Sequence, residues 1–118
     1  MKNTVKLVNF TPHIINILNK EGETLLNVLP FGSVARVETR EIYSGDMHVG
    51  TCNIPITERY AGRLIGLPCE VEDTIYIVSS MVACHKDAID RADLMVPGPL
   101  VRDAKGRPIG CLGLAHVS

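Results

Sequence analysis

The apolar residues of the chain recur with two different periods, and the change of period marks its best-defined segment. Residues 75–78 are β-branched or aromatic in succession, and Ser79 and Ser80 follow them, which is typical of a buried strand. Apolar residues then return at three- and four-residue intervals up to position 92, and either serine can cap a helix. The pattern therefore predicts one buried strand that leads into the principal helix of the protein, over about residues 80–92.

Shorter alternating segments, separated by turn formers, predict strands along the first half of the chain. Gly22 lies between two such segments and predicts a hairpin with a short loop. The sequence Ser44-Gly45-Asp46 predicts a second turn. Pro55 predicts an edge or a bulge in its strand, because proline has no amide proton for a sheet ladder. The predicted strands comprise residues 2–10, 14–18, 24–29, 34–43, 48–56 and 59–64.

The C-terminal segment predicts a β-hairpin. Asp103 favours the first position of a type I turn, and Gly106 favours the left-handed position that follows it. With no repeat, linker or low-complexity segment, residues 1–118 are interpreted as a single domain. The predicted fold class is α+β, with a mainly antiparallel β-sheet or partial barrel, one principal helix and this C-terminal hairpin.

Composition narrows the classes of function. The 118 residues are 46% hydrophobic and 21% charged, as in an ordinary folded globule. A net charge of −1 argues against a protein dedicated to duplex nucleic acid, which needs a basic face. The first residues lack the apolar core of a signal peptide, and no apolar run reaches membrane-spanning length. Four cysteines without a C-x-x-C spacing favour reduced thiols, so a cytoplasmic protein is expected.

Common catalytic and cofactor motifs are missing from the sequence. The four histidines, at positions 13, 48, 85 and 116, never occur at H-x-H or H-x-x-x-H spacing, so no metal site is predicted. There is no G-x-S-x-G elbow, no phosphate-binding loop of the Walker type and no G-x-G-x-x-G sequence. We therefore expect no catalytic residues and no cofactor, and a protein that is not an enzyme.

Arginines and two aromatic residues remain as candidates for a ligand site. Guanidinium groups bind phosphate through paired hydrogen bonds, and aromatic rings can stack on a base. Arg102 is the best candidate, because it points away from the neighbouring Asp103. For Arg107 the alternative is an ion pair with Asp103 across the predicted turn, and for Arg36 it is a surface pair with Glu38. The predicted ligand-binding residues are Arg102, Arg107, Arg36, Arg91, Tyr76 and Phe31.

Several motifs along the chain resemble those of small phage and prophage-type proteins of this length. They are the opening V-N-F-T-P-H, the middle G-L-P, the segment Y-I-V-S, and the closing P-G-P-L-V-R-D-x-x-G-R-x-I-G-C-x-G-L. In size and in its layout of strands with one helix, the chain is similar to the viral anti-defence sponges. The resemblance implies a homo-oligomer in the host cytoplasm that sequesters a nucleotide-derived immune signal without turnover. Such signals include the cyclic ADP-ribose isomers of Thoeris defence and the cyclic oligonucleotides of CBASS.

Two other classes of function stay open on the sequence. The first is a small enzyme that acts on a nucleotide or a related metabolite, with His85 or His48 as its acid or base. The second is a protein-binding or assembly module. Recovery of an intact ligand after denaturation would separate a sponge from an enzyme, and binding of proteins without any small molecule would favour the module.

Overall fold

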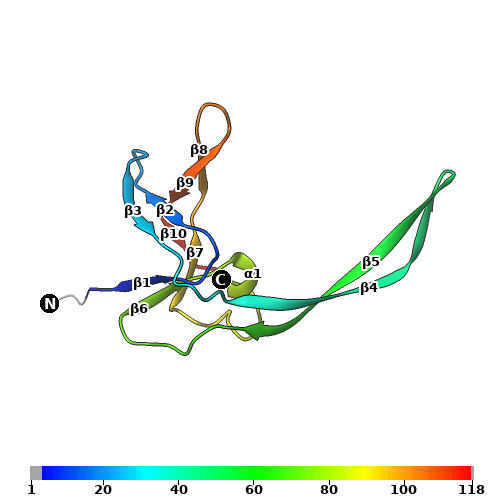
Figure 1. The fold of residues 1–118 in the computed structure, drawn as a ribbon, viewed down its shortest axis with the longest axis horizontal. Coiled ribbons are helices and arrows are strands. Elements are labelled where there is room, and N and C mark those ends of the chain that lie inside the picture. Colours follow the sequence, from blue (N-terminus) through cyan, green and yellow to red (C-terminus); the bar gives the residue numbers. More distant parts are fainter. Residues whose placement is uncertain (1–3, 118) are drawn as a thin grey trace.

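Two four-stranded sheets and one long two-stranded arm make up the fold (Figure 1). The computed structural model describes residues 4–117. The first sheet has the order β1-β6-β7-β10, with β1 (Lys6–Asn9), β6 (Thr74–Ile77), β7 (Leu94–Pro97) and β10 (Leu114–Ala115). The second has the order β3-β2-β9-β8, with β3 (Thr24–Val28), β2 (Ile15–Leu18), β9 (Pro108–Leu112) and β8 (Leu100–Arg102). The arm consists of β4 (Arg36–Val49) and β5 (Cys52–Ile65).

Strand β6 lies inside the first sheet and confirms the prediction of a buried strand at this position. It runs parallel to both of its neighbours, β1 and β7. Ile77 and Val78 at its end are completely buried, and Tyr76 packs edge-on against Phe10 with 5.4 Å between the ring centroids. The run of bulky apolar residues is therefore explained by burial on both faces of a parallel strand.

The helix predicted over residues 80–92 is wrong in length, because α1 spans only Ser80–Ala83. Its start is as expected, since the Ser79 side chain accepts a hydrogen bond from the Val82 amide. After α1, the Nδ1 atom of His85 accepts the amide proton of Asp87 at 3.1 Å. A continuing helix would direct that amide to the carbonyl of Ala83. The histidine side chain thus competes with the helical hydrogen bond, and the chain continues as turns.

The protein is mainly β, with mixed parallel and antiparallel sheets and one short helix, and the predicted partial barrel is wrong. The two hairpins β2–β3 and β8–β9 confirm their predictions. Parallel pairing of β1 with β6, β6 with β7 and β2 with β9 was not predicted. These pairs join segments that are separated in the sequence. The pairs of β1 with β6 and β6 with β7 belong to the first sheet, and the pair of β2 with β9 belongs to the second. No helix among residues 4–117 is long and apolar enough to cross a membrane.

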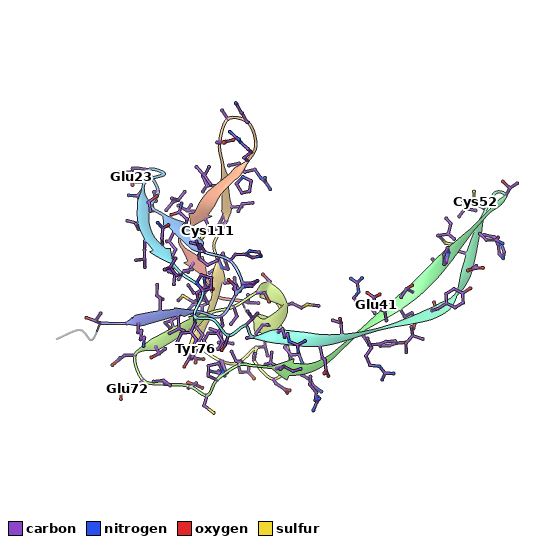
Figure 2. The ribbon with its side chains drawn as sticks, in the orientation of Figure 1. Glu23, Glu41, Cys52, Glu72, Tyr76 and Cys111 are labelled. Carbon is purple, nitrogen blue, oxygen red and sulfur yellow. The ribbon has the colours of Figure 1, made fainter. Side chains whose placement is uncertain are left out.

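The arm replaces three predicted strands with two strands of 14 residues each. The turn predicted at Ser44-Gly45-Asp46 is wrong, because the ladder continues through it with a register shift between Tyr43 and Gly45. A bulge absorbs the extra residue, and Gly45 takes a φ of 121° there. The chain reverses later, between the paired residues Val49 and Cys52. The arm extends away from the two sheets, with side chains projecting from both of its faces (Figure 2).

The motif N-F-T-P-H folds into a hydrogen-bonded turn around the side chain of Asn9, which is 1% exposed. Its Nδ2 group donates to the carbonyls of His13 at 2.7 Å and Val28 at 3.0 Å. Its Oδ1 atom accepts from the amide of Thr11 at 2.9 Å and from the Thr11 hydroxyl at 2.6 Å. Every hydrogen-bonding position of this amide is therefore used, and the turn is fixed where it leads into β2.

Candidate functional site

A cavity of about 470 Å³ lies against the β2–β9–β8 part of the second sheet. Its walls are largely apolar and include Pro97, Leu100, Pro108 and Ile109. Its volume is within the range of small-molecule sites, which combine apolar walls with a few polar groups. The lining comes from both ends of the sequence, because β2 pairs directly with β9. The first and last of the motifs noted in the sequence thus contribute to one cavity.

Asn16 provides an unsatisfied acceptor in this cavity. Its Nδ2 group donates to the carbonyl of Ile109 at 2.7 Å, and this bond fixes which way the amide is turned. The Oδ1 atom is then buried with no hydrogen-bond partner, and no other buried side-chain nitrogen or oxygen within residues 4–117 lacks one. Buried polar atoms are nearly always paired, so this oxygen has unused acceptor capacity, and a donor on a ligand can reach it only if the Asn16 side chain turns toward the cavity.

Close backbone packing holds the closing motif against the cavity. Gly98 donates its amide proton to the carbonyl of Gly113 at 3.0 Å, and a Cβ atom at Gly98 would lie 2.0 Å from the carbonyl oxygen of Leu112. At Gly110 a Cβ atom would lie 2.7 Å from the carbonyl oxygen of Asn16. Glycine is required at both positions because another part of the backbone occupies the space of a side chain.

Arg102 and Arg107 lie on the β8–β9 hairpin that contributes to the cavity. Arg102 is opposite Pro108 in the register, with a register shift just before it; Pro108 lines the cavity, whereas Arg102 itself does not. One of its nitrogens donates to the carbonyl of Gly106 at 2.8 Å. Arg107 forms an ion pair with Asp103 at 3.3 Å, so the alternative weighed for it is confirmed.

Phe31 and Tyr76 lie together at another place, on either side of Phe10. Phe31 stacks on Phe10 with 5.3 Å between centroids and is 63% exposed. Tyr76 is buried, and its hydroxyl donates to the carbonyl of Cys69 at 3.5 Å. A cavity of about 280 Å³ borders all three rings and also Lys6. The β8–β9 hairpin projects from a different part of the body (Figure 1), so the structure does not bring these aromatics to Arg102.

The other two predicted arginines are separate from both places. Arg36 borders a smaller cavity of about 200 Å³ near the base of the arm, on which Phe10 also lies. Arg91 is bound to Asp93 through both carboxylate oxygens, at 2.9 and 2.6 Å, and donates to the carbonyl of Pro68 at 2.8 Å. The hydrogen bond to Asp93 raises the pKa of Arg91. This side chain stabilises the fold and has little capacity left for a ligand.

Replacing Arg91 by alanine is expected to lower the free energy of unfolding by about 2 kcal/mol, because the buried carboxylate of Asp93 would lose its partner. Chemical denaturation at neutral pH measures this loss. Arg102→Ala is the matched control, since it removes an arginine that lies on the surface and should change stability by less than about 0.5 kcal/mol. Equal losses in the two variants would contradict a structural role for Arg91.

The histidines considered as an acid or base have other contacts. The Nε2–H of His85 donates to the carbonyl of Gly62 at 2.9 Å, while Nδ1 accepts from the Asp87 amide. Both ring nitrogens are therefore engaged in hydrogen bonds, and the bond of Nε2 to Gly62 connects the turn after α1 with the base of the arm. His48 lies on the exposed distal part of the arm, and its Nδ1 group is hydrogen-bonded to the side-chain Oδ1 atom of Asn53. Within residues 4–117, no three His, Cys, Asp or Glu side chains are grouped to hold a metal ion.

Two cavity residues were missed by the sequence reasoning. His13 is exposed, as its position after Pro12 indicates, and it also lines the cavity; the bond from Asn9 to its carbonyl fixes its place in the turn. Asn16 was not predicted as a site residue, because a polar residue is ordinary in a strand of alternating polarity. The signal that could have indicated it is its position in β2, one residue after Ile15 and shortly after the T-P-H motif.

Comparisons with protein-family models, with curated proteins and with solved structures find no match for this chain.

Proposed function

We propose that this protein is a phage-type anti-defence protein that sequesters a nucleotide-derived immune signal without turnover. The observation that carries the proposal is the apolar cavity at the β2–β9–β8 sheet, lined by Asn16, whose Oδ1 atom has no hydrogen-bond partner. The resemblance of the sequence motifs to phage proteins and sponges supplies the class of ligand, which comprises cyclic ADP-ribose isomers and cyclic oligonucleotides.

The cavity has chemistry suited to one nucleoside unit. The apolar walls fit the faces of a base. Asn16 Oδ1, turned toward the cavity, can accept a hydrogen bond from an exocyclic amine, which is a common edge group of purines and cytosine. Arg102 lies on the same hairpin, opposite the lining residue Pro108, and can bind a phosphate beside the cavity with its free guanidinium donors. His13 at the cavity supplies a further polar group. Tight binding needs only these contacts and no general base.

Saturating ligand is expected to raise the melting temperature strongly. A ligand at about 1,000 times its dissociation constant adds about 4 kcal/mol, which corresponds to many degrees for a domain of this size. Arg102→Ala should weaken binding by at least about 1.5 kcal/mol, because a charge-assisted hydrogen bond is lost, and Asn16→Leu should weaken it by a similar amount. A thermal-shift titration with cyclic dinucleotides, cyclic trinucleotides and cyclic ADP-ribose isomers measures both effects.

Matched controls locate the ligand. Arg36→Ala and Phe31→Ala alter the two cavities that border Phe10 and should leave affinity within about twofold. A strong loss in these variants, with Arg102→Ala unaffected, would contradict the assignment to the second sheet. The ligand should be recovered chemically unchanged after the protein is denatured. Conversion of the ligand would instead support the enzyme hypothesis.

The arm favours a second candidate, a protein-binding or assembly module. Beyond the contact of Gly62 with His85, the arm extends away from the two sheets (Figure 1), and an exposed apolar surface of this kind is typical of an element that binds another protein. A flat response to the nucleotide panel, together with stable assembly, would favour this candidate over sequestration.

A further inference from the structure

The arm has one apolar face and one polar face. Side chains alternate between the faces of a ribbon, and cross-strand partners share a face. Given the register of β4 with β5 and its bulge, one face carries Ile42, Met47, Val49, Cys52, Ile54, Ile56 and Tyr60. We call this set the apolar arm face. Its five largest aliphatic side chains are between 37% and 51% exposed, and no other part of residues 4–117 covers them.

The bulge in β4 is what makes this face continuous. Ile42 is even-numbered, whereas Met47 and Val49 are odd-numbered, so an unbroken strand would place them on opposite faces. The extra residue between Tyr43 and Gly45 reverses the alternation and brings all three onto one face. β5 has no such insertion here, and its apolar residues keep an even spacing from Cys52 to Ile56. A bulge in this place thus serves the apolar surface.

The opposite face satisfies its own polar groups. The Tyr43 hydroxyl donates to Asp46 at 2.7 Å, and Arg59 forms an ion pair with Glu41 at 2.7 Å. His48 is hydrogen-bonded to Asn53 near the tip. A surface with internal pairs can remain in water, whereas the apolar arm face is a contiguous exposed patch of the kind that marks an interaction site.

The chain exposes more surface than a folded monomer of its mass. Its accessible area is 8466 Å², whereas about 6,300 Å² is typical of a monomer of this mass. Its radius of gyration is 18.2 Å, whereas a compact domain of this length has about 13.5 Å. The excess of about 2,000 Å² per chain is greater than the roughly 800 Å² per partner that a stable interface needs. A lone two-stranded ribbon is also marginally stable in water.

We propose that the apolar arm face packs against the same face of a second copy of this chain, with the two arms side by side and their tips together. The face is self-complementary in charge. Between Ile42 and Tyr60 it carries Arg40 and Glu58, which are of opposite sign and lie diagonally on neighbouring strands; Glu38, nearer the base, is already paired with Arg63. A two-fold axis along the arms places β4 of each copy over β5 of the other, so Arg40 of each lies near Glu58 of the second copy. From Ile56 to the turn, apolar levels then meet apolar levels.

This packing brings the two Cys52 residues together, because Cys52 lies on the apolar arm face beside the turn. Cys52 is exposed and free. Two sheets pack about 10 Å apart, so a bis-maleimide of that span should link the two copies. The reaction is carried out on a Cys69→Ser/Cys84→Ser chain, since these two thiols are also exposed, and Cys52→Ser is the negative control. An oligomer that gives no Cys52 cross-link would overturn the arm-to-arm packing.

Paired substitutions on the two faces test the proposal in solution. Met47→Glu and Ile56→Glu place a charge on the apolar arm face, and each should raise the dissociation constant of the assembly at least about 100-fold. His48→Glu and Thr57→Glu are the adjacent residues on the opposite face and should leave assembly unchanged. Sedimentation at about 50 µM, well above the dissociation constant of a standard-size interface, reads the mass of each variant, and circular dichroism verifies folding.

The expected result is an oligomeric parent and oligomeric polar-face variants, with monomeric but folded apolar-face variants. A monomeric parent would overturn the proposal and leave the face to a different protein. Equal dissociation of all four variants would also overturn it, because the face would then make no difference. The inference does not depend on the proposed ligand, since mass and thermal shift are separate measurements.

Discussion

Replacing Asn9 by aspartate is expected to lower the free energy of unfolding by at least about 3 kcal/mol at pH 7. The Nδ2 group of Asn9 donates to two carbonyls, those of His13 and Val28. A carboxylate has no proton for either carbonyl, so its oxygen would face both of them in a site that is 1% exposed. Urea denaturation followed by circular dichroism measures the loss.

The pH dependence of this variant gives a sharper test. Burial and the two carbonyls favour the neutral form of the introduced carboxyl group, so its pKa in the folded state is raised. The destabilisation should therefore be smallest below the unfolded-state pKa of about 4 and should grow as pH rises. Asn27→Asp, on the exposed strand β3, makes the same chemical change and should cost less than about 0.5 kcal/mol. A similar loss in both variants would contradict the structural role of the Asn9 turn.

Replacing Gly98 by alanine is expected to cost about 3 kcal/mol or more, because the new methyl group would overlap a backbone carbonyl. The Cβ position lies 2.0 Å from the oxygen of Leu112 and 2.9 Å from that of Gly113. Relief requires the segment after β7 to separate from the segment between β9 and β10. That movement would break the bond from the Gly98 amide to the Gly113 carbonyl. Thermal and chemical denaturation both measure the effect.

Gly106→Asn is the matched control for this glycine. Gly106 has a φ of 82°, and a Cβ atom there would meet nothing within 4 Å. Asparagine tolerates the left-handed conformation, so the expected cost is below about 1 kcal/mol. A mild Gly98→Ala variant would show that the two segments can move apart, and the cavity they support would then be less rigid than described.

Local chemistry made some elements predictable from the sequence. The bulky apolar residues 75–78 predict a buried strand. Gly22 and Gly106 predict hairpin turns, because these positions take a positive φ. The helix was predicted too long because the same apolar spacing also fits a series of turns. These turns begin where the Asp87 amide donates a hydrogen bond to His85 Nδ1. The parallel pairs depend on residues far apart, such as Ile17 with Cys111, and no local pattern encodes such a pairing.

The candidate site was predictable only in part. Arg102 was chosen because it points away from Asp103; it lies on the hairpin that borders the cavity but does not line it, so its role as a ligand stays a prediction. The proposed aromatic partners Phe31 and Tyr76 are bulky for another reason, since they pack on Phe10. Asn16 stands out only in the folded chain, where its Nδ2 group donates a hydrogen bond to the carbonyl of Ile109 and its Oδ1 atom is buried without a partner. That arrangement comes from tertiary structure.

The pairing of β2 with β9 has a consequence for the order in which the chain can fold during synthesis. The arm and the β2–β3 hairpin connect neighbouring segments, so each can form soon after it leaves the ribosome. Strand β2 can pair with β9 only after residues 108–112 have been synthesised. Until then one edge of β2 stays open, and an exposed strand edge invites pairing with other chains. This edge of β2 is therefore paired only once β9 has been made.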